Sequence, residues 1–599
     1  MPALFGFFDP DAQLPADALR QMADVLRQPG EIAPLLELRG QHWQSAKIAY
    51  PGEAAFGQDF LVNGVAAFIH PAQDFKTFFA AVKQGRGGDV ALRGSFCAVI
   101  VEAEDTLSLV SDRYGTQPLY IYQAGSLLLF ATQVKAIAAL LGTARKINLD
   151  AVNAMLSFGE VLGNETLLAG VETLPAGSVL RIGPNGVQKS RYWQYTYEEN
   201  TKLDWSQAVE QSGRLLKAAI DESAAFSCRP AVPLSGGLDS RFALDLLVQQ
   251  KRDVKTYTWG VEDCRDLEFG GQIACALGVS HESYHFDPAY LSTLAERGVW
   301  LTEGHTPATN FHVLPYVDML VQRQHDLILD GFAGDAVLGG NFITGPWQYG
   351  SDYKNSADAL WFWRSQGFDG AWSATHASAA HELTKSRFMS LYQETAGKTA
   401  MDKAMAFLLD NRVRRITTCG TEIFRSSIPV YQPFMDAAFM DFIRTLPHGW
   451  RKRHRFYLDV LKTFGPRSSS APYQRTLLPA SAPYWQNWLS LATQRGLGMV
   501  GLGALLKGKS PSDFPAWFRG PLAMFVDNLL CSERTLDRGV MPADLVRSAV
   551  SEHRQGTHNL AGTLGAMISV ELFCRLFIDD LSGSASRLGA PGMAQREAA

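Results

Sequence analysis

The 599-residue chain has few cysteines and no strong excess of charge of either sign. Its seven cysteines show no C-x-x-C spacing, so the sequence indicates neither a zinc site nor a disulfide framework. Such cysteine usage is typical of a reducing compartment, and we expect a cytoplasmic protein. Charged residues make up 19% of the chain and the formal net charge is −5, which argues against a nucleic-acid partner.

Long apolar runs are also missing. The first residues lack the basic and apolar regions of a signal peptide, and no apolar run reaches the length of a membrane span. We therefore expect neither a signal peptide nor a membrane-spanning segment. Internal repeats are absent as well. A chain of this length predicts two domains, with room for a third module.

The most informative motif is Ser235-Gly236-Gly237-Leu238-Asp239-Ser240. A short apolar run before it indicates a strand, and the apolar pattern after it predicts a helix. Glycines let backbone N–H groups approach phosphate, and the helix N-terminus favours negative charge, so the motif indicates an anion site. Asp239 would repel phosphate unless a cation intervened, which predicts Mg²⁺ bound to pyrophosphate. The alternative is an ordinary glycine-rich turn between a strand and a helix.

Further strands are expected at 255–260, at 285–286 and at 327–329, where the last enters a second glycine-rich loop. Strands that alternate with helices predict a parallel sheet, which binds ligands at the carboxyl ends of its strands. Asp239 and Asp335 each follow a strand, so we expect both to bind Mg²⁺; a helix-capping role is the alternative for Asp335. The predicted nucleotide-binding residues are Pro233, Leu234, Ser235, Gly236, Gly237, Asp239, Ser240, Trp259, Asp330 and Gly331.

A second phosphate-binding pattern, G-x-x-x-x-G-K-S, occurs at 503–510. No strand-like run precedes it, and Pro511 and Pro515 disrupt the helix that should follow. We therefore do not expect residues 503–510 to bind a nucleotide.

The motif at 235–240 resembles the pyrophosphate loop of the ATP pyrophosphatases, which cleave ATP between the α and β phosphates. Together with other motifs, it makes the chain similar to the asparagine synthetase family over most of its length. These other motifs are Leu92–Phe96, Ser111–Tyr120, Phe130–Ala136, Leu174–Gly177, Arg191–Trp193 and Pro433–Asp436. The resemblance implies a two-domain α/β protein that uses ATP and Mg²⁺.

The family pattern implies a glutaminase-like antiparallel β-sandwich with helices in residues 1–200. A parallel-sheet ATP-pyrophosphatase domain, similar to the adenine nucleotide alpha hydrolases, is expected in residues 201–581. Residues 582–599 have the composition of a disordered tail.

Three departures from the family pattern refine the prediction. Glutamine-hydrolysing members have a nucleophilic cysteine after Met1, whereas this chain has Pro2, so we expect no glutamine hydrolysis. Phe332 stands where relatives have a glutamate or tyrosine that helps to activate the nucleophile, and phenylalanine relays no proton. Arg455 falls on the position of a family lysine, where it could hold phosphate but not act as a base; the alternative is a solvated basic turn.

Glu422 and Asp410 lie in the segment where the family keeps a second acidic catalytic residue. Each is a candidate for that catalytic role, and the alignment there needs gaps. Residues 341–410 form an aromatic-rich insertion with Trp347, Trp361, Trp363 and Trp372.

Loss of glutaminase chemistry means that the nucleophile is an amine already present on the substrate. Among relatives, this combination resembles the lasso-peptide macrolactam synthetases, which join a precursor peptide's Asp or Glu side chain to its own N-terminal amine. That resemblance implies a precursor peptide as substrate and a transient complex with a leader protease and a leader-peptide-binding protein. The alternatives are another amide synthetase (β-lactam-forming or ammonia-dependent asparagine-forming) and a non-catalytic binding scaffold.

Overall fold

The structure is a computed structural model. It describes residues 2–27, 35–50, 65–68, 75–90, 92, 94–225, 227–339, 353–365, 378–499 and 510–588. Trp347, Trp372, most of the 503–510 pattern and residues 589–599 lie outside the described residues.

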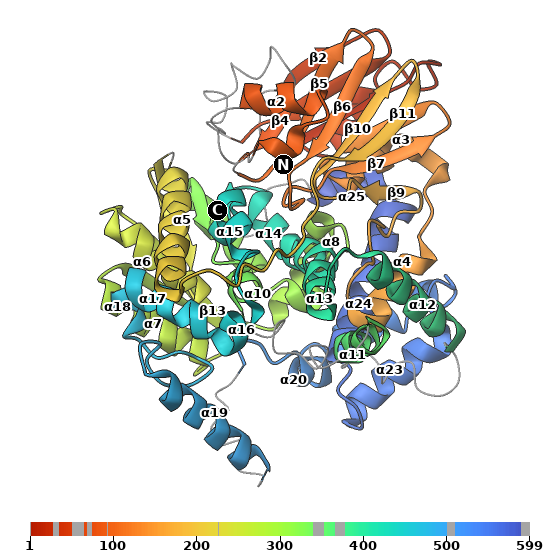
Figure 1. The fold of residues 1–599 in the computed structure, drawn as a ribbon. Coiled ribbons are helices and arrows are strands. Elements are labelled where there is room, and N and C mark those ends of the chain that lie inside the picture. Colours follow the sequence, from red (N-terminus) through yellow and green to blue (C-terminus); the bar gives the residue numbers. More distant parts are fainter. Residues whose placement is uncertain are drawn as a thin grey trace.

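The N-terminal part forms two antiparallel sheets among the described residues (Figure 1). The first has the order β2 (Leu35–Arg39), β3 (Trp43–Ile48), β1 (Ala3–Phe8), β8 (Leu127–Ala131), β7 (Tyr120–Ala124), β9 (Val171–Thr173). The second has the order β11 (Gly186–Arg191), β10 (Ser178–Gly183), β6 (Thr106–Ser111), β5 (Phe96–Ala103), β4 (Val65–Phe68).

Strand β1 is buried on both of its faces, which explains its nearly continuous apolar sequence. Leu4 and Phe8 point between the sheets, where they pack with Cys97 and Leu109 of the second sheet. Residues on the opposite face of β1 pack on helices α1 (Ala18–Asp24), α3 (Val134–Leu141) and α4 (Leu149–Phe158). This arrangement confirms the predicted antiparallel sandwich with helices.

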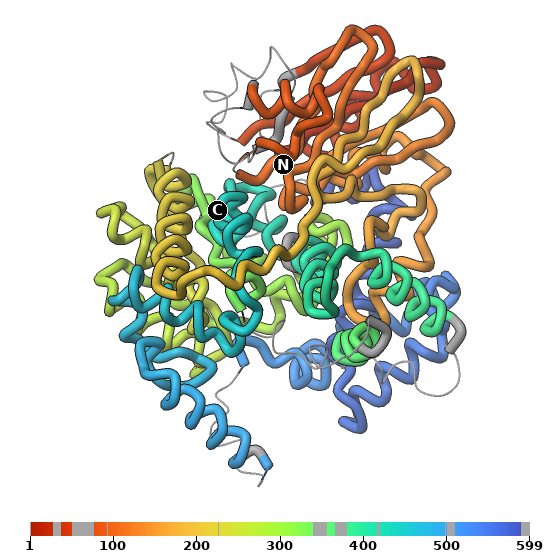
Figure 2. Tube along the Cα trace, in the orientation of Figure 1, coloured from red at the N-terminus to blue at the C-terminus, as the bar shows by residue number. Residues whose placement is uncertain are grey.

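The second half of the chain holds a parallel sheet with β12 at its centre, which confirms the predicted fold class. The strand order is β14 (Ser280–His285), β13 (Lys255–Gly260), β12 (Pro230–Pro233), β15 (Leu327–Leu329), β16 (Val430–Tyr431). Crossovers and covering layers use α5 (Trp205–Ala225), α6 (Asp239–Gln249), α7 (Arg265–Leu277), α8 (Ala289–Thr302), α9 (Leu314–Gln322) and α17 (Arg455–Phe464). Figure 2 shows the chain leaving the sandwich and crossing the molecule to reach α5. The carboxyl ends of β12, β13 and β15 therefore meet at one edge.

The remaining helices surround this sheet or lie beneath the sandwich, except α2 (Phe75–Lys83), which packs on the second sheet of the sandwich (Figure 1). Besides α2, they are α10 (Gly334–Leu338), α11 (Tyr353–Ser365), α12 (Ser378–Glu394), α13 (Ala400–Leu408), the π-helical η7 (Leu409–Thr417), α14 (Thr418–Arg425), α15 (Ala437–Ile443), α16 (His448–Arg451), α18 (Pro466–Ser469), α19 (Tyr484–Met499), α20 (Phe514–Arg519), α21 (Ala523–Leu530), α22 (Glu533–Leu536), α23 (Ala543–Gln555), α24 (Ala561–Phe573), the π-helical η11 (Cys574–Asp579) and α25 (Leu581–Leu588). Helix α25 corrects the predicted tail, because residues 582–588 are helical.

The continuous helix Ala561–Asp579 is long and apolar enough to cross a membrane by length and composition. The sequence patterns led us to expect no such segment. However, 83% of its most apolar window is buried inside the fold, where it contacts α4, α8, α21 and α23. Its apolar sequence is therefore that of a core helix.

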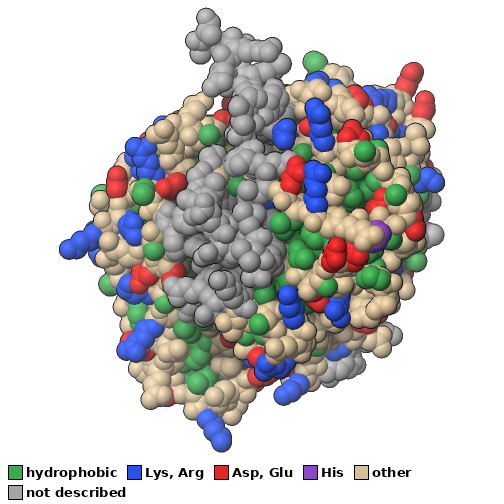
Figure 3. Space-filling view, turned by 90° about the horizontal axis from the view of Figure 1, so that it is seen from above, with side chains coloured by type: hydrophobic (Ala, Val, Ile, Leu, Met, Phe, Trp, Pro, Cys, Tyr) green, Lys and Arg blue, Asp and Glu red, His purple; other side chains and the backbone are tan. Residues whose placement is uncertain are grey.

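Lys and Arg side chains lie among Asp and Glu side chains on the face shown in Figure 3. On the described part of this face they do not gather into one basic patch. The mixed charge agrees with the small net charge of −5.

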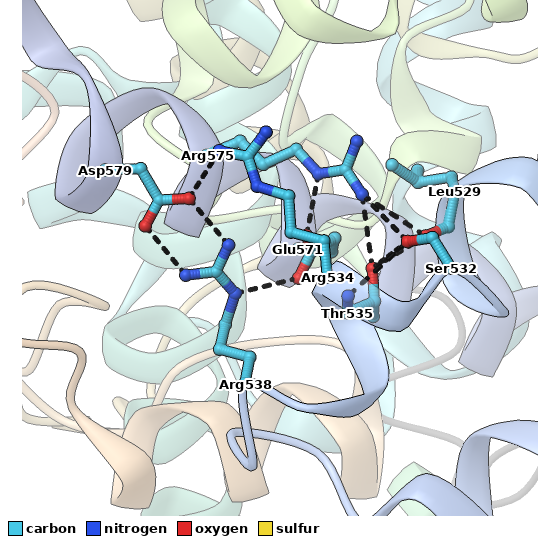
Figure 4. A network of polar contacts seen from close by, with 8 residues as sticks. All are labelled: Leu529, Ser532, Arg534, Thr535, Arg538, Glu571, Arg575 and Asp579. Atoms are coloured by element: carbon cyan, nitrogen blue, oxygen red, sulfur yellow. Dashed lines mark hydrogen bonds and ion pairs between the residues drawn. The ribbon is translucent and has the colours of Figure 1, made fainter.

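A network of ion pairs fastens α22 to the end of α24 and to η11 (Figure 4). Glu571 is fully buried and accepts from Arg575 Nε at 2.7 Å and from Arg538 Nε at 3.2 Å. Asp579 accepts from Arg534 and Arg538 at 2.6–2.8 Å, and these arginines lower the pKa of Asp579 to about 2. The network thus places one carboxylate in the core and another near the surface.

We predict that Glu571→Gln markedly lowers the midpoint of urea-induced unfolding. Removing one partner of a buried ion pair leaves uncompensated charge and costs about 3–5 kcal/mol. The matched control is Asp527→Asn, which breaks the more exposed pair with Arg554 and should cost about 0–1 kcal/mol. Circular dichroism measures both midpoints, and equal shifts would contradict the dominant role of Glu571.

Candidate functional site

A cavity of about 1020 Å³ lies at the carboxyl ends of β12, β13 and β15. It brings together almost all of the residues predicted to bind nucleotide and metal. Those on its wall are Pro233, Leu234, Ser235, Gly237, Asp239, Ser240, Trp259, Asp330, Gly331 and Asp335. Gly236 is not on the wall, because its N–H group turns inward and donates to Asp266 Oδ1 at 2.9 Å.

The loop at 235–240 is held by its own small side chains. The Ser235 N–H donates to Ser240 Oγ at 3.1 Å, and the Gly237 N–H donates to Ser235 Oγ at 3.2 Å. Helix α6 then begins after Leu238 without a side-chain cap. The first N–H groups of a helix have no intrahelical acceptor, so this uncapped N-terminus can receive an anion in the cavity.

Arg241 fixes the loop from behind. Its side chain is fully buried and donates to the carbonyl oxygens of Gly237 (2.7 Å) and Gly236 (2.9 Å). It also donates to the carbonyls of Ala471 at 3.0 Å and Pro472 at 2.6 Å. Because these loop carbonyls are bound to Arg241, their negative ends point away from the anion site.

Asp239 and Asp335 lie side by side. Asp239 Oδ2 accepts from the backbone N–H of Asp335 at 2.9 Å, and Asp239 Oδ1 accepts from the Tyr457 hydroxyl at 2.8 Å. Burial, followed by the charge of Asp335, raises the pKa of Asp239 to about 7. A Cβ on Gly334 would lie 2.6 Å from the Asp239 carboxyl carbon, so only glycine permits this approach.

The pair fits Mg²⁺ but does not form a complete metal site alone. Nowhere in the described ranges do three or more His, Cys, Asp or Glu side chains form a group that could hold a metal. Mg²⁺ commonly uses one or two carboxylates together with substrate phosphates, which suits two aspartates facing an anion site. The cation would also relieve the repulsion that raises the pKa of Asp239.

His454 is a site residue that sequence reasoning missed. Its Nε2 hydrogen-bonds Asp335 Oδ1, and Arg475 Nη1 donates to its Nδ1 at 3.1 Å. Since Nδ1 accepts from an arginine, Nε2 carries the proton and donates to Asp335. His454 is the N-cap residue of α17 and has left-handed backbone, so its approach to Asp335 could not be read from helical spacing.

The structure corrects the placement of Arg455. Its guanidinium lies 4.9 Å from the ring centroid of Trp205 and 5.9 Å from that of Tyr484. It is not among the residues that line the cavity; Arg265 and Arg475 provide basic side chains there instead.

The two acidic candidates also lie elsewhere. Glu422 is paired with Arg425 at 2.8 Å, away from the cavity wall, and burial raises the pKa of Glu422. Thr421 from the same helix does line the cavity, near Asp330. Asp410 lines a separate, smaller cavity. Neither acid is therefore placed to take part in chemistry in the main cavity.

Asp330 lines the cavity together with Asp239, Asp266 and Asp335. Burial raises the pKa of Asp330 to about 6, while the nearby charge of Arg425 acts in the opposite direction. Its neighbour Phe332 lines the same cavity and packs against the sheet core.

Strained backbone surrounds the site. Ala333, Arg453 and His454 have φ angles of 71°, 54° and 62°, a region that residues other than glycine seldom occupy. Such conformations persist where the surrounding structure enforces them, and they gather at functional sites. Here they position Asp335 and His454.

Comparison with known proteins agrees with both halves of the fold. Residues 75–193 match the glutamine amidotransferase domain family, and residues 212–464 match the asparagine synthase family. The two matches cover different domains and together span more than half of the chain. The order of the two matches agrees with the resemblance to asparagine synthetases found in the sequence.

Among relatives, asparagine synthetase [glutamine-hydrolyzing] 1 of Bacillus subtilis is 25% identical over 42% of this chain and 40% of its own length. The carboxyethyl-arginine beta-lactam-synthase of Streptomyces clavuligerus is 24% identical over 41% of this chain and 46% of its own length. The chain thus matches less than half of the length of either relative.

Two solved structures show only distant likeness. Glutamine phosphoribosylpyrophosphate amidotransferase from B. subtilis has a TM-score of 0.21 at 10% identity and covers 47% of this chain and 90% of its own. The NH3-dependent NAD synthetase from Campylobacter jejuni has a TM-score of 0.18 at 15% identity and covers 31% and 94%. The fold assignment therefore rests on the chain's own sheets.

We predict that Asp239→Asn stabilises the free protein increasingly as the pH rises. The pKa of Asp239 is raised from 3.8 to about 7, so the wild-type fold loses stability as pH rises through this range. Asn does not ionise, and the gain in melting temperature over wild type should grow between about pH 5 and about pH 8. Mg-ATP should raise the melting temperature of the wild type only. A pH-independent difference would contradict this account.

Proposed function

We propose that this protein forms an amide by activating a carboxylate with ATP. The observation that carries the proposal is the uncapped N-terminus of α6, whose first residue Asp239 lies beside Asp335 on the wall of one cavity. An anion site beside two adjacent carboxylates suits a nucleotide whose phosphates are bridged by a cation. Bound Mg²⁺ would neutralise charge on the phosphates.

The reaction has two steps. In the first, an oxygen of the substrate carboxylate attacks the α phosphorus of ATP, the bond to the β phosphate breaks, and pyrophosphate leaves. In the second, an amine attacks the acyl carbon, loses a proton, and AMP leaves. The N–H groups at the start of α6 and the side chains of Arg265 and Arg475 stabilise the phosphate charge.

Asp330 is the proton acceptor in this proposal. A carboxylate with a pKa of about 6 is ionised at neutral pH yet basic enough to take a proton from an attacking amine. The role falls to Asp330 because Phe332 beside it cannot relay a proton. Glu422 faces away and is neutralised by Arg425.

For the substrate, we favour a precursor peptide whose own N-terminal amine closes a macrolactam ring on an Asp or Glu side chain, as in lasso-peptide synthesis. Three features support this choice: a cavity large enough for a peptide segment, its aromatic wall of Trp259, Phe286, Phe332 and Phe424, and the absence of glutaminase groups. Pro2 precedes β1, and the one cysteine among residues 1–200, Cys97, is buried in β5. The amine then comes from the substrate, and a leader protease and a leader-peptide-binding protein are the expected transient partners.

A β-lactam-forming synthetase is the second candidate. It is favoured by the similarity to the carboxyethyl-arginine beta-lactam-synthase and would also use an amine of the substrate itself. A non-catalytic scaffold is disfavoured, because the loop, Asp239 and Asp335 keep the arrangement that ATP cleavage needs.

The test is incubation of the full chain with ATP, Mg²⁺ and a candidate precursor peptide. We expect AMP and pyrophosphate as primary products and a peptide that has lost one water by mass spectrometry. Added glutamine should change neither. Primary formation of ADP and orthophosphate would refute adenylation, whereas AMP formation without dehydrated peptide would refute the choice of substrate.

Asp330→Asn should separate the two steps. Loss of a general base typically costs about 10²–10⁴-fold, so amide formation should fall by that factor. Exchange of labelled pyrophosphate into ATP, which reports the first step alone, should persist. Equal loss of both activities would show that Asp330 serves nucleotide binding instead.

Phe332 variants probe positioning. Phe332→Ala should slow ring closure by up to about 10²-fold, because misplacement of tethered reactants loses orientation. Phe332→Tyr retains the shape and should change the rate far less than the 10²–10⁴-fold range typical of general-base catalysis. Single-turnover kinetics measures both, and a large acceleration by Tyr would show that proton transfer limits the reaction.

A further inference from the structure

A second cavity, of about 230 Å³, lies where the sandwich meets helices of the other domain. Its lining from the sandwich side is Arg113, Tyr114, Gly163, Asn164, Ala176, Arg191 and Trp193–Tyr195. Its lining from α12, α13, η7 and their connections is Leu391, Glu394–Ala396, Ala406, Leu409–Asn411 and Arg414. None of its lining residues also lines the main cavity. It is therefore a separate compartment between the domains.

Arg414 brings to this cavity a buried guanidinium with one nitrogen that lacks a hydrogen-bond partner among the described residues. Its side chain is only 6% exposed, its Nη2 donates to Asn164 Oδ1 at 2.9 Å, and its Nε donates to the Asp410 carbonyl at 3.3 Å. Its Nη1 is buried and has no hydrogen-bond partner among the described residues. An unsatisfied buried cationic donor is costly, so a ligand that supplies an acceptor gains binding free energy.

The other groups restrict the ligand. Asp410 and Glu394 line the same cavity together with Arg113 and Arg191, so a ligand there meets charge of both signs. The Asp410 carboxylate lies 4.0 Å from Arg414 Nε and is half-exposed, which leaves it available to a cation. Positive and negative groups a few ångströms apart match a zwitterion.

Part of the wall is apolar and aromatic. Tyr114 and Trp193 meet edge to face with ring centroids 5.0 Å apart, and Leu409, Leu391 and Met435 also line the space. The volume of about 230 Å³ is below the range of about 300–1,000 Å³ that is typical for drug-sized ligands. A small ligand with an apolar side chain fits both constraints.

We propose that this cavity binds a free α-amino acid with an apolar side chain. Its carboxylate accepts from Arg414 Nη1, its ammonium group faces Asp410 and Glu394, and its side chain packs beside Trp193 and Leu409. Burial lowers the pKa of Arg414 only to about 10, so the guanidinium stays charged at neutral pH.

Because of where this cavity lies, a ligand bound in it affects a wall of the main cavity. Arg414, Asp410 and Leu409 belong to the π-helical η7, and π-helical turns are common at functional sites. η7 continues directly into α14, whose Thr421 and Phe424 line the main cavity. An amino acid bound to η7 therefore fixes one wall of the nucleotide cavity.

The test is isothermal titration of the full chain, without nucleotide, with L-leucine as the probe. We expect saturable binding at one site. L-Leucinamide, which lacks the carboxylate, and N-acetyl-L-leucine, which lacks the ammonium group, should each bind at least about tenfold more weakly. No saturable heat with L-leucine up to about 10 mM would overturn the proposal. Equal binding of either analogue would also overturn it.

Variants locate the site. Arg414→Gln should weaken L-leucine binding at least about tenfold, whereas the matched control Arg412→Gln, two residues away and outside the lining, should not. Asp239→Asn should bind L-leucine like the wild type, which separates this site from the proposed ATP site. Should Arg414→Gln lose its circular dichroism signal, Ala396→Leu fills the cavity without changing charge and should abolish binding. Undiminished binding in a folded Arg414→Gln or Ala396→Leu would refute the site.

Discussion

The close pairing of Asp239 with Asp335 is the constraint on which the site depends. Burial of Asp239, followed by the neighbouring charge of Asp335, whose side chain is 45% exposed, disfavours ionisation of Asp239 and raises its pKa to about 7. Hydrogen bonds from the Tyr457 hydroxyl and the Asp335 N–H to the Asp239 carboxylate oppose this rise in pKa. His454, which accepts from Arg475, hydrogen-bonds Asp335, and Gly334 lets the two loops come into contact. The protein thereby maintains a position where a cation and phosphates are favoured partners.

Helix α14 joins this position to the sandwich. One side of the helix provides Thr421 and Phe424 to the cavity, while Arg425 donates to the Thr116 carbonyl at 2.7 Å. Thr116 is itself held by Asp112, which accepts its N–H and hydroxyl groups. The glutamine amidotransferase-type domain thus works as a structural support for the synthetase cavity, a role that needs no nucleophilic cysteine.

Local patterns predicted the parts of the site that depend on local structure. A strand, a glycine turn and a helix are read from adjacent residues, which is why the loop at 235–240 and Asp335 were found. Arg455 was proposed because it fell on the position of a family lysine. The left-handed turn at 453–454, beside which His454 instead reaches Asp335, cannot be read from periodicity. Asp410 and Glu422 were misplaced for a similar reason: the π-helical η7 shifts the phase of the helix between them. Helix α25 was not predicted, because the polar composition of its residues resembles that of a disordered tail.

The buried Arg241 has a consequence for the order of assembly. Its acceptors on the far side, the carbonyls of Ala471 and Pro472, are 230 and 231 residues away along the chain. At about 5–20 residues per second, ribosomes need roughly ten seconds or more to make that interval. Throughout that time the guanidinium lacks three of its five carbonyl acceptors, those of Ser468, Ala471 and Pro472. The phosphate loop therefore belongs to the last part of the nascent chain to mature, and slow translation or a truncated product would expose an unfinished loop to chaperones and proteases.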